Sequence, residues 1–198
     1  MGVDVMRWMY CNHKPEQNLL FGFHRADEVR RQFLIPLWNV YNFFVTYAKL
    51  DNWTPTQPSP SKGEGREGVG RRSILDRWII SRLNQVVNEV TADFEQYDAY
   101  GATLAIQELL EDLTNWYVRR SRRRFWKSEH DTDKEAAYAT LYHVLTTLIK
   151  ILAPITPFVT EVMYQNLVRG VDGSAPESVH HCYWPKTDET AIDHNLLD

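Results

Sequence analysis

Apolar side chains recur along this chain at steps of three and four residues, the spacing that lines one face of an α-helix. Stretches with this pattern predict five helices: one from Asp27, one over 75–97, one from about Thr103 through an arginine-rich run, one over 133–152, and a short one over about 158–167. No strand pattern alternates with them. The sequence therefore predicts an all-α antiparallel helix bundle and not a phosphate-binding α/β core.

Polar residues and prolines mark the ends of some of these helices. Asp27 is the predicted N-cap of the first, because its carboxylate can accept hydrogen bonds from the free N–H groups of the first turn. Thr132 and Glu135 have the spacing of a capping box before the fourth helix. Pro154 and Pro157 should end that helix, since proline lacks an N–H and clashes with the preceding turn.

The rest of the chain suggests three parts. Residues 1–22 have mixed polarity and predict a short irregular N-terminal segment, the tail of a preceding unit. Residues 23–169 form the expected bundle, interrupted over 54–73 by a stretch rich in proline and glycine that predicts a flexible surface insertion. Residues 170–198 are rich in turn-forming residues and predict a C-terminal extended strap or a small hairpin.

Composition excludes several classes of protein. Hydrophobic residues make up 43% of the 198 residues, which is enough for a packed core and argues against disorder. No apolar run approaches the ~20 residues that cross a bilayer, and the N-terminus lacks the pattern of a signal peptide. The two cysteines, Cys11 and Cys182, make no disulfide framework and favour a reducing, cytoplasmic setting.

Positive charge is concentrated in one short stretch. The formal net charge of −4 argues against a protein that binds nucleic acid over its whole surface. Residues 119–127, however, hold six of the 22 lysines and arginines. The local field around this stretch matters more for binding than the net charge does.

The arginine-rich run conflicts with the helical pattern before it. On an unbroken helix, the apolar stripe that includes Tyr117 continues to Arg120 and Arg124. Either the helix bends or ends near Ser121, or these two arginines point toward the bundle. In the second case they need carboxylate partners, because an unpaired buried charge is costly. The candidate partners are Glu89, Asp93, Glu95 and Asp112.

Two interpretations of this run remain open. In the structural one, Arg120 and Arg124 form ion pairs and the other cations decorate the surface. In the other, the run binds RNA, because guanidinium groups match phosphate oxygens and interleaved aromatic rings can stack on unpaired bases at ~1–3 kcal/mol per base. Both can hold together, with Arg120 and Arg124 supporting the fold and Arg119, Arg122 and Arg123 meeting the ligand.

No other group of residues meets the geometry that its chemistry requires. His180, His181 and Cys182 are adjacent, but neighbours in an extended strap point to opposite sides and no second pair stands at zinc-like spacing. The remaining histidines are scattered, and the carboxylates mostly form a solvated helix face. We therefore predict no catalytic residue and no metal site.

The run over 112–127, Asp-Leu-Thr-Asn-Trp-Tyr-Val-Arg-Arg-Ser-Arg-Arg-Arg-Phe-Trp-Lys, resembles a signature of isoleucyl-tRNA synthetases. Leu-Asp-Arg-Trp-Ile over 75–79 and Leu-Ala-Pro over 152–154 are similar to the same family, as is the opening Gly-Val-Asp-Val-Met-Arg-Trp over 2–8. The resemblance covers nearly the whole chain except 54–73. Valyl and leucyl relatives share the bundle, but the arginine run fits the isoleucine enzymes better.

This resemblance implies the anticodon-binding helical domain of a class I synthetase, with residues 1–22 leading from a catalytic core absent from this chain. The full enzyme would be an isoleucine–tRNA ligase that uses ATP and Mg²⁺, while this chain would hold no cofactor. Its expected partners are tRNA(Ile) and the other domains of the synthetase, with no membrane and no DNA. The implied RNA-binding residues are Asn115, Trp116, Arg119, Arg122, Arg123, Trp126 and Lys127.

A second function also fits the sequence. The apolar residues Leu19, Leu20 and Phe21 lie near the start of the chain, outside any predicted helix. They suggest a structural helical brace that packs against the rest of the synthetase with little direct RNA contact.

Overall fold

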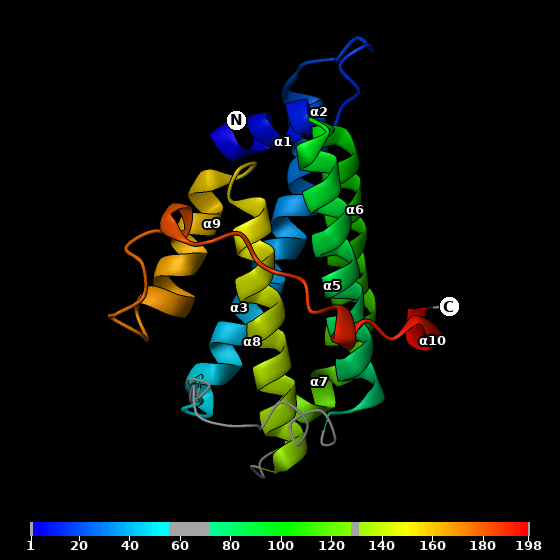
Figure 1. The fold of residues 1–198 in the computed structure, drawn as a ribbon. Helices are drawn as coiled ribbons and strands as arrows, with labels where there is room; N and C mark the ends of the chain where they lie inside the picture. The colour runs from blue at the N-terminus through cyan, green and yellow to red at the C-terminus, as the bar shows by residue number, and fades with distance from the viewer. Residues whose placement is uncertain (1, 56–71, 128–130, 198) are drawn as a thin grey trace.

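The structure, a computed structural model, describes residues 2–55, 72–127 and 131–197, and within these ranges it contains helices and no strand. Figure 1 shows four long helices, α3, α5, α6 and α8, running side by side in alternating directions. The predicted all-α antiparallel bundle is confirmed. The helices are α1 (Val3–Cys11), α2 (Phe23–Val29), α3 (Ile35–Leu50), α5 (Ile74–Glu95), α6 (Ala99–Glu111), α7 (Arg119–Trp126), α8 (Thr132–Leu152), α9 (Pro157–Tyr164) and α10 (His194–Leu197).

The core lies between the long helices and is almost entirely apolar. Each helix contributes side chains from a single face, as the spacing of its apolar residues predicts. Burial of one large aliphatic side chain stabilises a fold by roughly 1.5–3 kcal/mol, so these residues supply most of the driving force for assembly. Fully buried members include Leu37, Ile79, Leu83, Val86, Ile106, Leu109, Leu113, Leu141, Leu145 and Leu148.

The N-terminal segment is more regular than predicted, because residues 3–11 form α1. Trp8 is buried and stacks on Phe33, with ring centroids 3.4 Å apart. Asp4 accepts hydrogen bonds from two backbone N–H groups in the first turn of α9, and Arg7 donates to two carbonyls just before that helix. These long-range contacts stabilise a short helix whose own sequence pattern is weak. The division of the chain at residues 22 and 169 stays a prediction.

Two predicted helix caps are wrong. Asp27 lies inside α2, which begins at Phe23, and its carboxylate pairs with two arginines of the following turn. The N-cap of α8 is Asp131, whose side chain accepts a hydrogen bond of 2.8 Å from the backbone N–H of Lys134. The predicted capping box of Thr132 and Glu135 is therefore replaced by a cap one residue earlier.

The C-terminal residues form the predicted strap, and no strand of a hairpin occurs in the described part of it. Figure 1 shows this strap crossing α8 and α5. Five hydrogen bonds join the strap to side chains of α5 and hold it against that helix. They join Trp184 to Thr91, Thr187 to Asn88, the N–H of Asp188 to Asn84, the N–H of Asp193 to Ser81, and Arg77 to the carboxylate of Asp193.

Two further sequence predictions concern the insertion over 54–73 and the absence of a membrane span. Most of the predicted flexible insertion, residues 56–71, lies outside the described residues. Among the residues that are described, no helix has the length and apolar character that a membrane span requires.

Candidate nucleic-acid interface

A π turn joins α6 to α7 and changes which side chains face the core. Asp112–Val118 is π-helical, between two regular α-helices. A π turn holds more residues than an α turn, so positions after it shift around the helix axis. The fully buried side chains after the turn are consequently Ser121 and Phe125, and Arg120, which an unbroken helix would turn inward, is exposed.

This shift corrects the prediction for Arg120. The side chain is exposed, and no ion pair joins it to another described residue. Its guanidinium instead lies over the ring of Trp116, 4.5 Å from the centroid. An exposed contact of this kind contributes ~0.5–1 kcal/mol. Arg120 therefore belongs to the surface and not to the structural ion pairs.

Arg124 is held by acidic partners that the sequence analysis did not name. Its side chain is only 12% exposed and forms a bidentate pair with Asp76 of α5, with both N–O distances at 2.7 Å. A second pair of 2.8 Å joins it to Asp133. Glu89, Asp93, Glu95 and Asp112 were the wrong candidates, since Asp112 pairs with Arg82 instead.

Asp76 is fully buried and has hydrogen bonds on both carboxylate oxygens. It accepts from the Tyr117 hydroxyl at 2.7 Å and from the N–H and hydroxyl of Ser73, with which it forms the capping box of α5. Burial alone would raise the pKa of Asp76, but its hydrogen bonds to Arg124 and the charge of that guanidinium hold the pKa below its ordinary value. Asp76 is thus a stable buried anion.

The seven predicted RNA-binding side chains are all exposed, and most lie close together. Trp116 is 50% exposed and Trp126 is 56% exposed, although large aromatic rings are usually buried. Steps of three, four and seven residues bring Arg119, Arg122, Arg123 and Trp126 onto adjoining positions of α7. We call this surface the arginine face, defined as Trp116, Arg119, Arg120, Arg122, Arg123 and Trp126.

The arginines of this face have no acidic partners in the described chain. No ion pair there includes Arg119, Arg120, Arg122 or Arg123, so their charge is available to a ligand. Lys127 differs, because its ammonium lies 3.3 Å from Asp131 and 3.4 Å from Asp133. Hydrogen bonds to these two carboxylates raise the pKa of Lys127. Lys127 is therefore a weaker candidate than the arginines.

A groove of about 490 Å³ lies beside the arginine face, between α3 and the segment that leads into α7. Its lining includes Asn115, Arg119 and Arg122, with Asn39 and Phe43 on the α3 side. Amide side chains can donate and accept hydrogen bonds, as the edge of a nucleobase requires. Sequence analysis missed Asn39, although one signal was present: Ile35–Leu50 contains no acidic residue.

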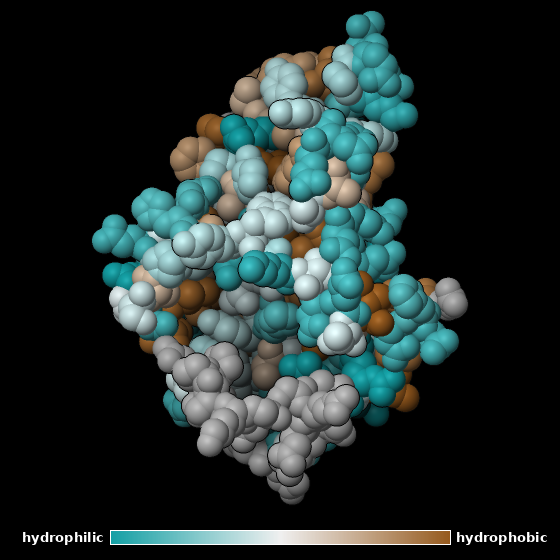
Figure 2. All heavy atoms as spheres, viewed as in Figure 1, coloured by the Kyte–Doolittle hydropathy of each residue, from teal (hydrophilic) through white to brown (hydrophobic). Residues whose placement is uncertain are grey.

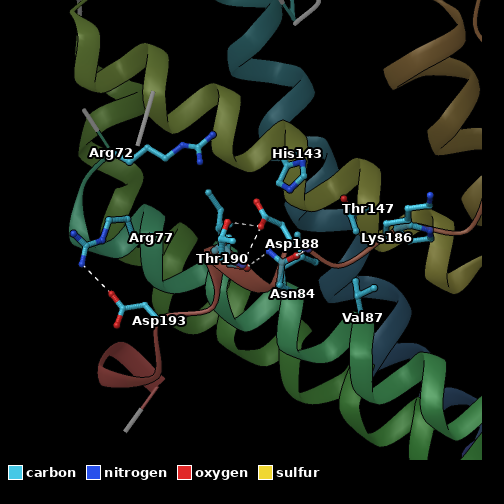
Figure 3. Close-up of a pocket in the computed structure, with 14 residues that line it drawn as sticks. Arg72, Arg77, Asn84, Val87, His143, Thr147, Lys186, Asp188, Thr190 and Asp193 are labelled. Atoms are coloured by element: carbon cyan, nitrogen blue, oxygen red, sulfur yellow. Dashed lines mark hydrogen bonds and ion pairs between the residues drawn. The ribbon is translucent and has the colours of Figure 1, made fainter. Parts of the chain in front are cut away.

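A second cleft, of about 580 Å³, lies between α5, α8 and the strap (Figure 3). Arg72 and Lys186 lie at its two ends, and His143 projects into it from α8. The cleft is lined by side chains of both charges, and some of them pair with each other: Arg77 lies 3.2 Å from Asp193. A polyanion would meet carboxylates here, so the arginine face is the better candidate for RNA.

The strap residues considered for metal binding do not form a cluster. His180 and His181 lie in a single 3-10 turn that ends before Cys182. No group of three or more histidine, cysteine or acidic side chains among the described residues is arranged to hold a metal ion.

Comparison with known families gives a match over most of the bundle. The family described as "Anticodon-binding domain of tRNA ligase" matches residues 76–197, which extend from the first turn of α5 to α10. The matched region includes the π turn and the whole arginine face.

Curated relatives match nearly the whole chain. The isoleucine–tRNA ligase of Dehalococcoides mccartyi strain CBDB1 is 50% identical over 98% of this chain. The corresponding ligases of Thermus thermophilus and Methanothrix thermoacetophila are 43% and 44% identical over 99% and 98% of it. The chain spans 18% of the length of each of these relatives.

A solved structure has the same fold. In the LeuRS–tRNA–LeuAMS ternary complex of Agrobacterium radiobacter K84, the matching region covers 96% of this chain and 20% of that protein, with a TM-score of 0.64. The sequences are 17% identical, so this likeness concerns the fold alone.

Proposed function

The chain belongs to the family of anticodon-binding domains of tRNA ligases, and we propose on this premise that it binds the anticodon stem and loop of an isoleucine-accepting tRNA. The observation that carries the proposal is the arginine face. It joins four guanidinium groups, none in an ion pair with another described residue, to two half-exposed indole rings. Identities of 40–50% to isoleucine–tRNA ligases support the choice of amino acid.

The two kinds of side chain on this face have different roles in the proposed complex. The guanidinium groups bind phosphates, which gives affinity and orientation without reading sequence. Trp116 and Trp126 offer flat surfaces on which unpaired bases of the loop can stack. The groove lined by Asn39 and Asn115 adds amide groups next to the phosphate contacts. The α3 wall has no carboxylate that would repel the RNA backbone.

In the whole enzyme, we propose that this binding holds tRNA(Ile) while other domains carry out aminoacylation with ATP and Mg²⁺. The domain itself contributes no catalytic residue. Its effect on the reaction is positional, because a tRNA held at the anticodon end presents its acceptor end at a raised effective concentration. We propose the cytoplasm as the setting, since the chain has only two cysteines, both free.

Charge reversal tests this proposal. Arg119→Glu with Arg123→Glu should weaken binding of an isoleucine-accepting tRNA transcript by on the order of a hundredfold at ~0.1 M salt, because two phosphate contacts become repulsions. A matched control, Arg25→Glu with Arg30→Glu, makes the same change in net charge on α2 and the residue that follows it. Fluorescence anisotropy measures both affinities. Equal losses in the two double variants would show that only net charge matters and would refute a specific face.

A second candidate function rests on the opposite end of the molecule. A cavity of about 630 Å³ there is lined by Leu19, Leu20 and Phe21 together with polar and charged side chains, and Figure 2 shows apolar side chains among polar ones at the end that carries α1 and α2. Exposed apolar side chains with a polar rim are suited to a protein contact. The domain could thus act as a brace against the rest of the synthetase. Large apolar side chains exposed on or near α1 and α2 are Val3, Tyr10, Leu20, Phe21 and Phe23.

A complementation assay separates the two functions. If this chain binds no tRNA at low salt but restores aminoacylation to a ligase lacking this domain, the brace is its main function. If it binds tRNA and the arginine double variant loses complementation, the RNA-binding function holds. Both surfaces can act in the same enzyme, because they lie at opposite ends of the bundle (Figure 1).

A further inference from the structure

We propose that Asp76 is a positioning residue for RNA binding: its buried carboxylate fixes the rotation of α7 and so keeps the arginine face turned to solvent. The inference rests on the proposed function, because it concerns how that face is presented. Asp76 itself does not touch the RNA, since it is fully buried at the first turn of α5.

The carboxylate joins the residues on both sides of the point where the helix changes phase. Tyr117 belongs to the π turn and Arg124 to α7, and both donate to the same oxygen, Oδ1 of Asp76, at 2.7 Å. A second bond of 2.7 Å runs from Arg124 to Oδ2. A bidentate guanidinium–carboxylate pair sets the direction of approach as well as the distance. The pair therefore restrains rotation of α7 about its axis.

Asp76 itself is held in a fixed position at the start of α5. Asp76 lies in the capping box of α5, where Ser73 donates to it from both its N–H and its hydroxyl. The following residues of α5 enter the core, with Ile79 and Leu83 fully buried. The position of the carboxylate is thus set by the core, and it transmits that position to α7.

This restraint is needed because the rotation of α7 depends on whether the preceding turn is π-helical or α-helical. If the turn reverted to α-helix, α7 would rotate by about 100°, the angle of one residue. Arg120 would then occupy the inward position that Ser121 now fills. Arg124 also pairs with Asp133 of α8 at 2.8 Å, so two carboxylates orient its guanidinium. Of these two, Asp76 is the one that also bonds Tyr117 of the π turn.

The test compares Asp76→Asn with Leu148→Ala in the full chain. Leu148 is a fully buried residue of α8, and its truncation lowers stability without removing a polar contact of α7. Well below the melting temperature, Asp76→Asn should weaken tRNA binding about tenfold. It should also flatten the dependence of log Kd on log salt by about 0.7–0.9 for each phosphate that the face no longer neutralises. Leu148→Ala should change neither quantity.

Two further variants show whether the effect passes through Arg124. Arg124→Gln should weaken binding at least as much, because it also removes the pair with Asp133. The double variant Asp76→Asn with Arg124→Gln should lose no more than Arg124→Gln alone, because both changes break the Asp76–Arg124 link. If Asp76→Asn does not fold, Tyr117→Phe removes the 2.7 Å hydrogen bond to Asp76, together with a longer one of 3.4 Å to the Ala137 carbonyl. It should weaken binding by a factor of about two or three. A wild-type affinity and salt slope in Asp76→Asn or Tyr117→Phe would overturn the proposal.

Hydrogen exchange of α7 separates failure of this inference from failure of the proposed function. Amides 119–126 should exchange faster in Asp76→Asn than in Leu148→Ala at equal stability, with no RNA present. If wild-type protein fails to bind tRNA but this contrast appears, the RNA-binding proposal falls and the restraint on α7 stands. If wild-type protein binds tRNA and the two variants exchange alike, the restraint is refuted.

Discussion

Arginines occur at both ends of this bundle, and the two groups are treated in opposite ways. On α2 and just beyond it, Arg25 pairs with Glu28 at 2.9 Å, and Arg30 and Arg31 each pair with Asp27 at 2.5 Å. On the arginine face, no described acidic residue pairs with any of the four guanidinium groups. The number of arginines is thus a poor guide to function. What distinguishes the arginine face is that none of its guanidinium groups is in an ion pair within the described residues.

The two ends differ in apolar surface as well. Around α1 and α2, exposed rings and aliphatic side chains adjoin the paired charges, a combination suited to a protein partner. On the arginine face, the exposed apolar groups are two indole rings beside guanidinium groups, a combination suited to RNA. A single core thus supports two surfaces of different chemistry, and each end can be altered separately.

The largest expected effect comes from Arg124, the arginine of α7 that is paired. Arg124→Met leaves the buried Asp76 without its charge partner and should lower the free energy of unfolding by about 3 kcal/mol. The matched control on the same helix, Arg120→Met, should lower it by ~1 kcal/mol or less, because that side chain is exposed and loses only its contact with the Trp116 ring. Urea unfolding followed by circular dichroism measures both. Similar losses in the two variants would show that the distinction between them is wrong.

The next prediction makes the α7 end resemble the α2 end. Asn115→Glu introduces a carboxylate four residues before Arg119, where the two side chains can pair on the helix surface. We expect tRNA affinity to fall about tenfold, since Arg119 then pairs with the new carboxylate in place of a phosphate and a negative charge is added to the face. Asn115→Gln is the neutral control and should retain nearly full affinity. If Asn115→Gln also lost tRNA affinity tenfold, the loss would come from moving the amide group of Asn115 and not from the added carboxylate.

The smallest expected effect lies at the apolar end. Leu20→Ser with Phe21→Ser should change the free energy of unfolding by less than ~0.5 kcal/mol, because these side chains are 84% and 53% exposed. Affinity for tRNA should not change, whereas complementation of a ligase lacking this domain should weaken. If this double variant lost as much tRNA affinity as Asn115→Glu, the proposal that one end binds RNA and the other contacts protein would be wrong.

The long helices could be predicted from sequence because their apolar spacing is strong and continuous. α5 and α8 begin within one residue of their predicted starts. α1 could not be predicted, since its nine residues depend on contacts with Phe33 and with the start of α9. Short elements that are stabilised by distant partners leave little local signal.

The candidate site was predictable in composition but not in orientation. The seven residues predicted from chemistry and resemblance are all exposed, and their contact with RNA stays a prediction. A regular helix turns Arg120 inward, and the sequence left open whether the helix continues unbroken or bends near Ser121. A π turn inserts its extra residue without a distinctive sequence. The partner of Arg124 was missed for a different reason: Asp76 is 48 residues away in sequence, and only the packing of α5 against α7 brings the two together.

Hydroxyl-radical footprinting of an isoleucine-accepting tRNA transcript, with the wild-type chain and with Arg119→Glu plus Arg123→Glu, tests most directly whether the arginine face contacts RNA. We predict that the wild-type chain protects riboses of the anticodon stem and loop and that the double variant loses this protection. Equal protection by both proteins, or protection confined to another part of the tRNA, would contradict the assignment of this face.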